Sequence, residues 1–145
     1  MDIPKLQSEA EAGDAIAQTH LGIAYLDGTE VSKDFATAQR WLTVAAEKNT
    51  PLALLHLGRM HQAGWGVSLE LHKALDYFQR AAEGGEWLAY IHIARMHRYG
   101  RGTPTDEEKA SYWYYTAISK SNDTHPRREL EEAIDYVQSL NNPPD

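Results

Sequence analysis

Histidines have the richest potential chemistry in this sequence, because imidazole binds metals and transfers protons near neutral pH. Two pairs are each five residues apart: His56 with His61, and His92 with His97. On a helix, this spacing turns the two rings about 140° from each other, whereas a helical zinc pair needs a spacing of four. A further set, His20, His56 and His92, recurs every 36 residues. On stacked helices about 8–10 Å apart, its nitrogens would not share a zinc ion at about 2 Å. We therefore expect no metal site.

Motifs for catalysis are also missing from the sequence. It contains no G-x-S-x-G, no P-loop and no complete G-x-G-x-x-G. The adjacent carboxylates Glu107–Glu108 and Glu131–Glu132 are interpreted as solvated helix surface rather than as acid–base pairs. The sequence therefore predicts a protein without catalytic residues or a cofactor.

Composition restricts the classes of partner and the location. The chain of 145 residues has a net charge of -7 at pH 7 and no cysteine. Nucleic-acid binding needs a clustered excess of Lys and Arg, so we expect no nucleic-acid partner. The first residues show no apolar signal-peptide core, and no run of about 18 apolar residues occurs. We expect a cytoplasmic protein without membrane association.

A repeat of 36 residues organises the middle of the sequence. In the first half of each unit the recurring sets are Ala17, Ala53 and Ala89; Leu21, Leu57 and Ile93; and Gly28, Gly64 and Gly100. In the second half they are Ala38, Ala74 and Ala110; Trp41, Tyr77 and Trp113; Leu42, Phe78 and Tyr114; and Ala45, Ala81 and Ala117. These columns fall at the spacing of one helix face, so each unit is predicted to be a helix–turn–helix.

Residues with special backbone or capping preferences mark the ends of the expected helices. The first helix of each unit is expected to end at the recurring glycine, which tolerates a left-handed conformation. The second helix is expected to start near Asp34, Glu70 and Asp106, and to close at Asn49, at Gly84 or Gly85, and at Asn122. An apolar stripe after Pro126 predicts a further helix over 126–140, with Asp123 or Thr124 as its N-cap.

These columns resemble the Sel1-like repeat, a relative of the tetratricopeptide repeat. The first unit matches the pattern of that family at Ala17, Leu21, Gly22, Tyr25, Gly28, Val31, Asp34, Ala38, Trp41, Ala45 and Ala46; the second matches at Ala53, Leu57, Gly58, Gly64, Gly66, Val67, Ala74, Ala81, Ala82 and Gly85. Departures from it are His61 and His97 at the position of Tyr25, Ala94 at that of Gly22, and Glu30 in place of the second turn glycine. The resemblance implies an all-α, right-handed α-solenoid.

The chain is therefore expected to form a single domain over 1–140. Its parts are an N-terminal capping half-unit (1–13), three repeats (14–49, 50–85 and 86–121), a C-terminal capping helix (122–140) and a flexible tail (141–145). Capping segments are expected because stacked repeats need polar ends.

The resemblance also implies a concave groove lined by the first helices, where related proteins hold other proteins. The groove columns are Ile16, Leu52 and Leu88; His20, His56 and His92; Ile23, Arg59 and Arg95; and Asp27, Ala63 and Tyr99. The arginine guanidinium suits a carboxylate, so the expected partner is a protein or peptide with an acidic group. The alternative is that Arg59 and Arg95 pair with neighbouring carboxylates of the chain itself. Protonation of the histidines near their ordinary pKa is expected to make binding pH-dependent.

Two tryptophans are candidates for contacts at the groove edge. Trp65 lies in a turn where the other units have Thr29 and Arg101, and Trp87 starts the first helix of the third unit. The leading hypothesis is a non-catalytic scaffold or adaptor in a regulatory or signalling assembly. The alternatives are a self-associating structural solenoid and, third, an enzyme that uses the histidines as acid and base.

Overall fold

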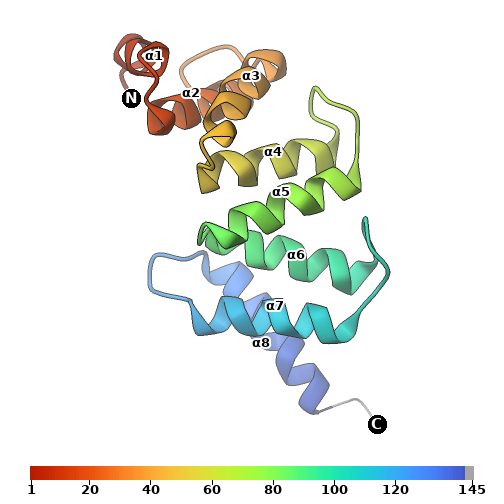
Figure 1. Cartoon of the computed structure of the whole chain (residues 1–145). Helices are drawn as coiled ribbons and strands as arrows, with labels where there is room; N and C mark the ends of the chain where they lie inside the picture. Colours follow the sequence, from red (N-terminus) through yellow and green to blue (C-terminus); the bar gives the residue numbers. More distant parts are fainter. Residues whose placement is uncertain (143–145) are drawn as a thin grey trace.

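The computed structural model describes residues 1–142, and all regular secondary structure in these residues is α-helical. The helices are α1 (Ile3–Glu11), α2 (Ala15–Asp27), α3 (Phe35–Glu47), α4 (Pro51–Ala63), α5 (Leu71–Glu83), α6 (Trp87–Tyr99), α7 (Glu107–Ser119) and α8 (Arg127–Asn141). Figure 1 shows them stacked in chain order, with the two termini at opposite ends of an elongated array. The predicted all-α solenoid is confirmed. The expected tail, 141–145, starts within α8, and residues 143–145 lie outside the described part.

Three hairpins form the repeated part of the fold. We call their first helices, α2, α4 and α6, the A helices, and their second helices, α3, α5 and α7, the B helices. Each A helix ends at the predicted glycine: Gly28, Gly64 and Gly100 have φ of 74°, 72° and 66°. A side chain is strained at these left-handed values, so glycine ends the helix and turns the chain toward the B helix.

Acidic residues start the B helices at the predicted positions. The carboxylates of Asp34 and Asp106 accept hydrogen bonds from the backbone N–H groups of Thr37 and Lys109, at 3.1 and 3.0 Å. Such bonds satisfy donors that have no partner within the helix. Glu70 holds the same position in the second unit without a side-chain capping bond.

The ends of the B helices differ from the prediction in the third unit. Asn49, with φ of 56°, and Gly85, with φ of 87°, are left-handed as expected. However, α7 ends at Ser119 and its C-cap Lys120 has φ of -102°, so Asn122 does not close this helix.

The predicted N-cap of α8 is also wrong. The N-cap is Pro126, and no side chain caps the helix. The reason is a separate turn before it, in which the Asn122 side-chain oxygen accepts hydrogen bonds from the N–H and the hydroxyl of Thr124, at 2.9 and 2.6 Å. Asp123 and Thr124 therefore belong to this turn.

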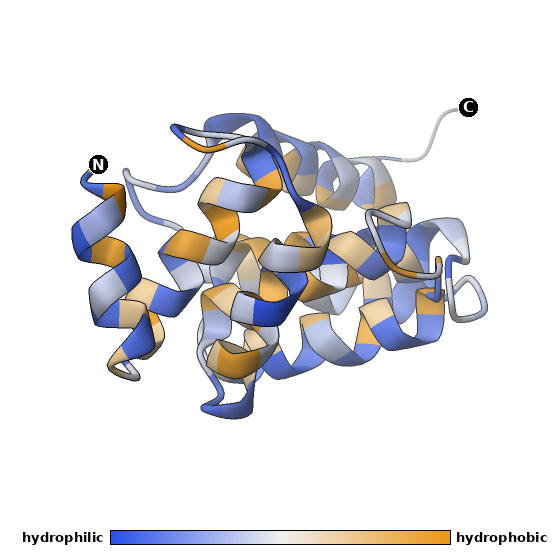
Figure 2. Ribbon diagram, turned by 90° about the horizontal axis from the view of Figure 1, so that it is seen from above, coloured by the Kyte–Doolittle hydropathy of each residue, from blue (hydrophilic) through white to orange (hydrophobic). Residues whose placement is uncertain are grey.

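Close packing between A and B helices makes the core. The B helices contribute a column of fully buried side chains, Leu42, Phe78 and Tyr114. Gly58 on α4 faces Phe78 so closely that a Cβ there would lie 2.7 Å from the ring. Figure 2 shows the matching alternation of apolar and polar residues along the helices. The repeated small residues therefore set the helix spacing, because packed interiors have little room for added volume.

The helix α8 takes the place of a further A helix. It packs on α7 as α4 packs on α3 and as α6 packs on α5. Three residues connect those earlier pairs (48–50 and 84–86), whereas seven residues, 120–126, connect α7 to α8. Counted from the first residue of each helix, Glu132 is the sixth residue of α8, as His56 is of α4 and His92 is of α6. None of the helices within residues 1–142 has the length and apolar composition to cross a bilayer.

Candidate functional site

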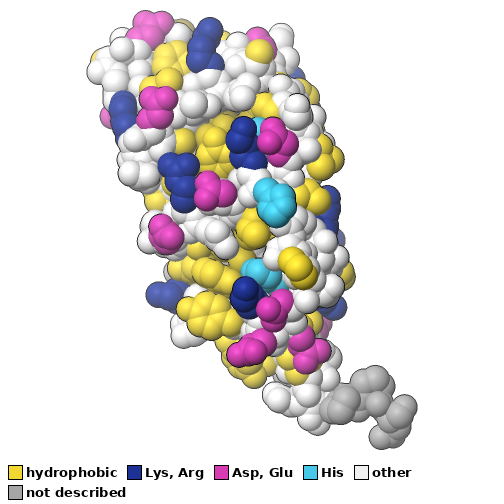
Figure 3. Space-filling model, turned by 45° about the vertical axis from the view of Figure 1, so that its right-hand side comes forward, with side chains coloured by type: hydrophobic (Ala, Val, Ile, Leu, Met, Phe, Trp, Pro, Cys, Tyr) yellow, Lys and Arg dark blue, Asp and Glu magenta, His cyan; other side chains and the backbone are white. Residues whose placement is uncertain are grey.

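The outward residues of the A helices differ in how much surface they leave accessible. Ile16 at the start of α2 and Tyr99 at the end of α6 are each 61% exposed. Between them, Leu52 and Leu88 are partly buried against the core, while Asp27 at the end of α2 is exposed. In Figure 3, which views one face of the molecule, apolar patches alternate with cationic, anionic and histidine side chains. The surface is mixed in character rather than uniformly apolar or charged.

The predicted row of histidines occupies three different environments. His20 is exposed, whereas His56 is 8% exposed and its buried Nδ1 has no hydrogen-bond partner within residues 1–142. The ring of His92 stacks on Phe78, with the centroids 4.6 Å apart and the planes 5° from parallel. His56 and His92 therefore belong to the packing between successive helices, and the row does not offer three equivalent donors to a partner.

The predicted protonation of this row near the ordinary histidine pKa is wrong for the buried His56 and the partly buried His92. Burial, aided by the charge of Arg59, lowers the pKa of His56 to about 4. Burial together with Arg95 and Arg59 lowers the pKa of His92 to about 3. Both rings are therefore neutral at pH 7, because a buried cation beside other cations is unfavourable.

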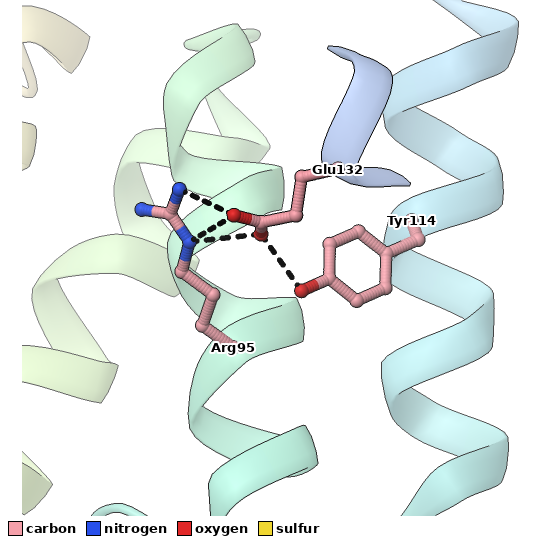
Figure 4. A network of polar contacts seen from close by, with 3 residues as sticks. All are labelled: Arg95, Tyr114 and Glu132. Atoms are coloured by element: carbon pink, nitrogen blue, oxygen red, sulfur yellow. Dashed lines mark hydrogen bonds and ion pairs between the residues drawn. The ribbon is translucent and has the colours of Figure 1, made fainter. Parts of the chain in front are cut away.

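The guanidinium of Arg95 is held by a carboxylate of the same chain. Its Nη2 lies 2.8 Å from Oε1 of Glu132 and its Nε lies 2.9 Å from Oε2. The Tyr114 hydroxyl donates to the same Oε2 at 2.9 Å, so α6, α7 and α8 meet at one carboxylate (Figure 4). The alternative that the arginines pair within the chain is thus confirmed for Arg95.

The electrostatics of this network favour its ionised form. Burial opposes ionisation of Glu132, but the hydrogen bonds from Arg95 and Tyr114 outweigh burial and lower the pKa of its carboxyl group. Burial and the carboxylate raise the pKa of Tyr114. At neutral pH the network is therefore an ion pair with an added hydrogen bond that joins α6, α7 and α8, and its groups are not poised to exchange a proton. We call it the Glu132 network.

Sequence reasoning missed this role of Glu132. The Glu131–Glu132 pair was interpreted as solvated surface, which fits only Glu131, whose ion pair with Arg127 is exposed. The sequence does hold a signal for it: when α8 is aligned with the A helices, Glu132 falls in the column of His56 and His92. A strict 36-residue period does not show this match, because the longer connection shifts α8 by four residues.

The equivalent arginine of the second unit is in a different environment. The Arg59 guanidinium lies 5.8 Å from the ring centroid of Trp65. Within residues 1–142, no carboxylate lies at ion-pair distance from Arg59. In the first unit the column carries Ile23, which packs against the core. One column therefore holds an apolar residue, a cation without a carboxylate and a cation with one.

Trp65 forms one wall of a cleft between the first two A–B turns. Its side chain is 37% exposed and stacks on Phe35, with the ring centroids 6.5 Å apart. The cleft has a volume of about 160 Å³, and we call it the turn cleft; its lining residues are Leu26, Asp27, Lys33, Phe35 and Trp65. The predicted edge contact at Trp65 therefore stays a prediction, on a side chain that is partly accessible.

Trp87, the other tryptophan predicted at the edge, is a core residue. It is 4% exposed, and its indole N–H donates to the carbonyl oxygen of Ala117 at 2.8 Å. His125 from the long α7–α8 connection stacks on its ring, with the centroids 4.6 Å apart. The prediction of an edge contact at Trp87 is therefore wrong, because this connection covers the start of α6.

The other polar side chains that could do chemistry are histidines and carboxylates, and a metal ion would need at least three of them together. No group of three or more His, Asp or Glu side chains within residues 1–142 is placed to hold a metal ion. His61 and His97, which take the position of the partly buried Tyr25, are 5% and 4% exposed. The arrangement supports binding through exposed apolar and cationic side chains.

Comparisons with known proteins add an independent result. The profile of the Sel1 repeat matches residues 15–50, 51–86 and 87–122. A Sel1 repeat protein from Oxalobacter formigenes is 32% identical, with a TM-score of 0.76 over 92% of this chain and 98% of that chain. The protective antigen c5321 of uropathogenic Escherichia coli is 25% identical, with a TM-score of 0.80 over 98% of this chain and 34% of that chain. Cysteine rich protein B of Helicobacter pylori, at 17% identity, shares the fold with a TM-score of 0.66 over 85% of this chain and 93% of that chain. No curated protein matches the sequence.

Proposed function

Because this chain belongs to the Sel1 repeat family, we propose that it is a non-catalytic scaffold that holds a peptide or protein segment along its A helices. Proteins of this family are generally scaffolds for protein interaction. The proposal places this scaffold in a regulatory or signalling assembly of the cytoplasm. The observation that carries it is the exposure of apolar side chains at both ends of the A-helix surface, Ile16 and Tyr99.

Physical considerations support binding at this surface. Large apolar side chains left accessible in a folded protein contribute to affinity when a partner removes them from water. Among the polar residues between these ends, Arg95 is fixed by its ion pair with Glu132. A surface whose side chains are already fixed loses less conformational entropy when it binds.

Site-specific photo-crosslinking tests the proposal. A photoreactive amino acid is placed at position 16 or 99 of the full chain, and cross-linked proteins are identified by mass spectrometry. Position 112 is the matched control, because Tyr112 is 63% exposed but lies on the B helix α7. The scaffold proposal expects the same partner at positions 16 and 99 and none of it at position 112.

A second pair of variants gives the result that would contradict the proposal. Ile16→Ser and Tyr99→Ser alter exposed side chains, so they are expected to leave the fold intact. Capture of the cross-linked partner should fall in both variants. Unchanged capture by the doubly substituted protein would show that the partner binds elsewhere.

Self-association is the second candidate function, and two exposed aromatic residues favour it. Tyr112 and Tyr115 on α7 are 63% and 50% exposed and lie about one helical turn apart. Exposed aromatic side chains are frequent anchors at protein interfaces. Sedimentation velocity over a range of concentrations tests this candidate. A monomer at every concentration would exclude it, whereas a dimer lost in the Tyr112→Ser, Tyr115→Ser protein would support it.

A further inference from the structure

We propose that the turn cleft is an anchor site for an acidic segment of a partner protein, in which one apolar side chain packs against Trp65 and a neighbouring carboxylate pairs with Arg59. This inference rests on the proposed scaffold function and specifies the partner chemistry. Two parts of the structure carry it: a cleft with three apolar walls and, beside it, a cation with no carboxylate at ion-pair distance within residues 1–142.

The size of the turn cleft fits a side chain. Its volume is about 160 Å³, whereas small-molecule sites have volumes of roughly 300–1,000 Å³. Leu26, Phe35 and Trp65 give it apolar walls. A cleft of this size and character suits one apolar side chain presented by a peptide.

Trp65 is placed at the cleft by its surroundings, although the turn does not require a tryptophan. The same turn carries Thr29 in the first unit and Arg101 in the third. The next residue, Gly66, has φ of 69°, and a Cβ at this position would collide with Phe35. The turn is therefore pressed against Phe35, which orders the indole before a partner binds. Tryptophan in such a preformed position is a typical binding hot spot.

The charges around the turn cleft favour an acidic partner. Lys33 lies 5.9 Å from the Phe35 ring centroid, and Arg59 lies 5.8 Å from that of Trp65. Asp27 is the only carboxylate among the residues that line the cleft. The lining itself holds one cation, Lys33, and one anion, and Arg59 beside Trp65 adds a second cation, in a protein whose net charge is -7. This local excess of positive charge would attract carboxylates and orient them.

The third unit shows what a guanidinium in this column does when a carboxylate is supplied. Arg95 takes both oxygens of Glu132, with its closest contact at 2.8 Å. Arg59 stands in the same column, and residues 1–142 offer it no carboxylate at ion-pair distance. Its neighbour at the position of Glu132 is the neutral His92, whose pKa Arg59 helps to lower. An acidic partner would therefore supply to Arg59 what α8 supplies to Arg95.

Peptide selection tests the anchor site, and the repeat itself provides substitutions that suit the fold. Short random peptides displayed on phage are selected on the immobilised full chain, and the enriched peptides are then measured by fluorescence anisotropy. The test variants are Trp65→Thr and Arg59→Ile, which copy Thr29 and Ile23 of the first unit. The control is Arg101→Thr, which introduces the same threonine at the equivalent turn position of the third unit.

Enriched peptides are expected to combine an aromatic or aliphatic residue with an adjacent Asp or Glu. Trp65→Thr should weaken their binding by about tenfold or more, and Arg101→Thr should leave it unchanged. Arg59→Ile should weaken binding of the acidic peptide but not of its amide counterpart. Equal binding to wild type and to Trp65→Thr would overturn the anchor site, and so would the same loss with the acidic and amide peptides in Arg59→Ile.

The outcomes separate this inference from the scaffold proposal. If a partner cross-links at positions 16 and 99 while Trp65→Thr binds every enriched peptide as wild type does, the scaffold proposal stands and the anchor site fails. If no peptide is enriched and no partner cross-links at either position, both fail.

Discussion

The junction between α5 and α6 and the junction between α7 and α8 are built on equivalent positions but use different chemistry. In the first, Phe78 stacks on the neutral ring of His92, and Arg59 lies near that ring without a carboxylate in the described chain. In the second, the corresponding groups are Tyr114, Glu132 and Arg95, joined by hydrogen bonds and an ion pair. The difference shows that the same repeat position can hold an aromatic stacking contact in one unit and an ion pair in the next.

The consequence concerns binding more than stability. Where the following helix supplies a carboxylate, the arginine is bound within the chain. Where it supplies a neutral histidine, the arginine has no carboxylate at ion-pair distance within residues 1–142, and here its guanidinium lies over the Trp65 ring. The residue at this position of the next helix therefore distinguishes the unit whose arginine is paired within the chain from the unit whose arginine is not paired within residues 1–142.

The largest expected effect on stability comes from Phe78, and Tyr114 at the equivalent position is the comparison. Phe78→Ala should lower the free energy of unfolding by about 3–5 kcal/mol, because it removes a fully buried ring and leaves a cavity. Tyr114→Phe keeps the ring and removes one hydrogen bond to a carboxylate, so a smaller loss of about 1.5–3 kcal/mol is expected. Urea denaturation followed by circular dichroism measures both. A larger loss in Tyr114→Phe would reverse this view of the two junctions.

Glu132→Gln is expected to have the next largest effect, about 2 kcal/mol, because Arg95 then has a neutral partner in a partly buried place. Glu131→Gln is the matched control. Its exposed pair with Arg127 should contribute less than about 0.5 kcal/mol. Hydrogen exchange should show faster opening of α8 in Glu132→Gln alone. Equal free energies of unfolding in the two variants would mean that the Glu132 network does not stabilise the fold.

Acidification tests the buried histidines. The folded-state pKa of His92 is about 3 and that of His56 about 4, below the ordinary value of 6.5. Between pH 6.5 and 4 the unfolded chain therefore binds more protons, and stability should fall as the pH falls, by about 1 kcal/mol per pH unit for each histidine. Urea denaturation across this range should show a smaller slope in His92→Gln. The same slope as in wild type would place His92 outside the core junction.

The smallest expected effect is that of Arg59→Ile. Since Ile23 fills this position in the first unit, the change should alter the free energy of unfolding by less than about 0.5 kcal/mol. The same change at Arg95 should cost about 2 kcal/mol, because it leaves Glu132 without its guanidinium. Denaturation midpoints of the two variants measure the contrast. A large loss in Arg59→Ile would show that this arginine holds the fold together and is not kept for a partner.

Much of the fold was predictable because its determinants are local. Gly28, Gly64 and Gly100 end the A helices as expected, since the left-handed conformation depends on the residue itself. The burial of His61 and His97 agrees with their place in the column of Tyr25, which packs against the core. The position of α8 was predicted to within one residue, but its N-cap was predicted incorrectly, because the turn at Asn122 takes up Asp123 and Thr124.

The sequence by itself determined the repeat, the helices and the faces that pack together, because helix periodicity and turn preferences act over a few residues. Only the tertiary structure decided which residues of the outward columns are available. Arg59 and Arg95 occupy the same column, and what separates them is a carboxylate 37 residues beyond Arg95 that the long connection brings into contact with it. Availability for binding is a property of such distant neighbours, because a charged group pairs with whatever the fold places beside it.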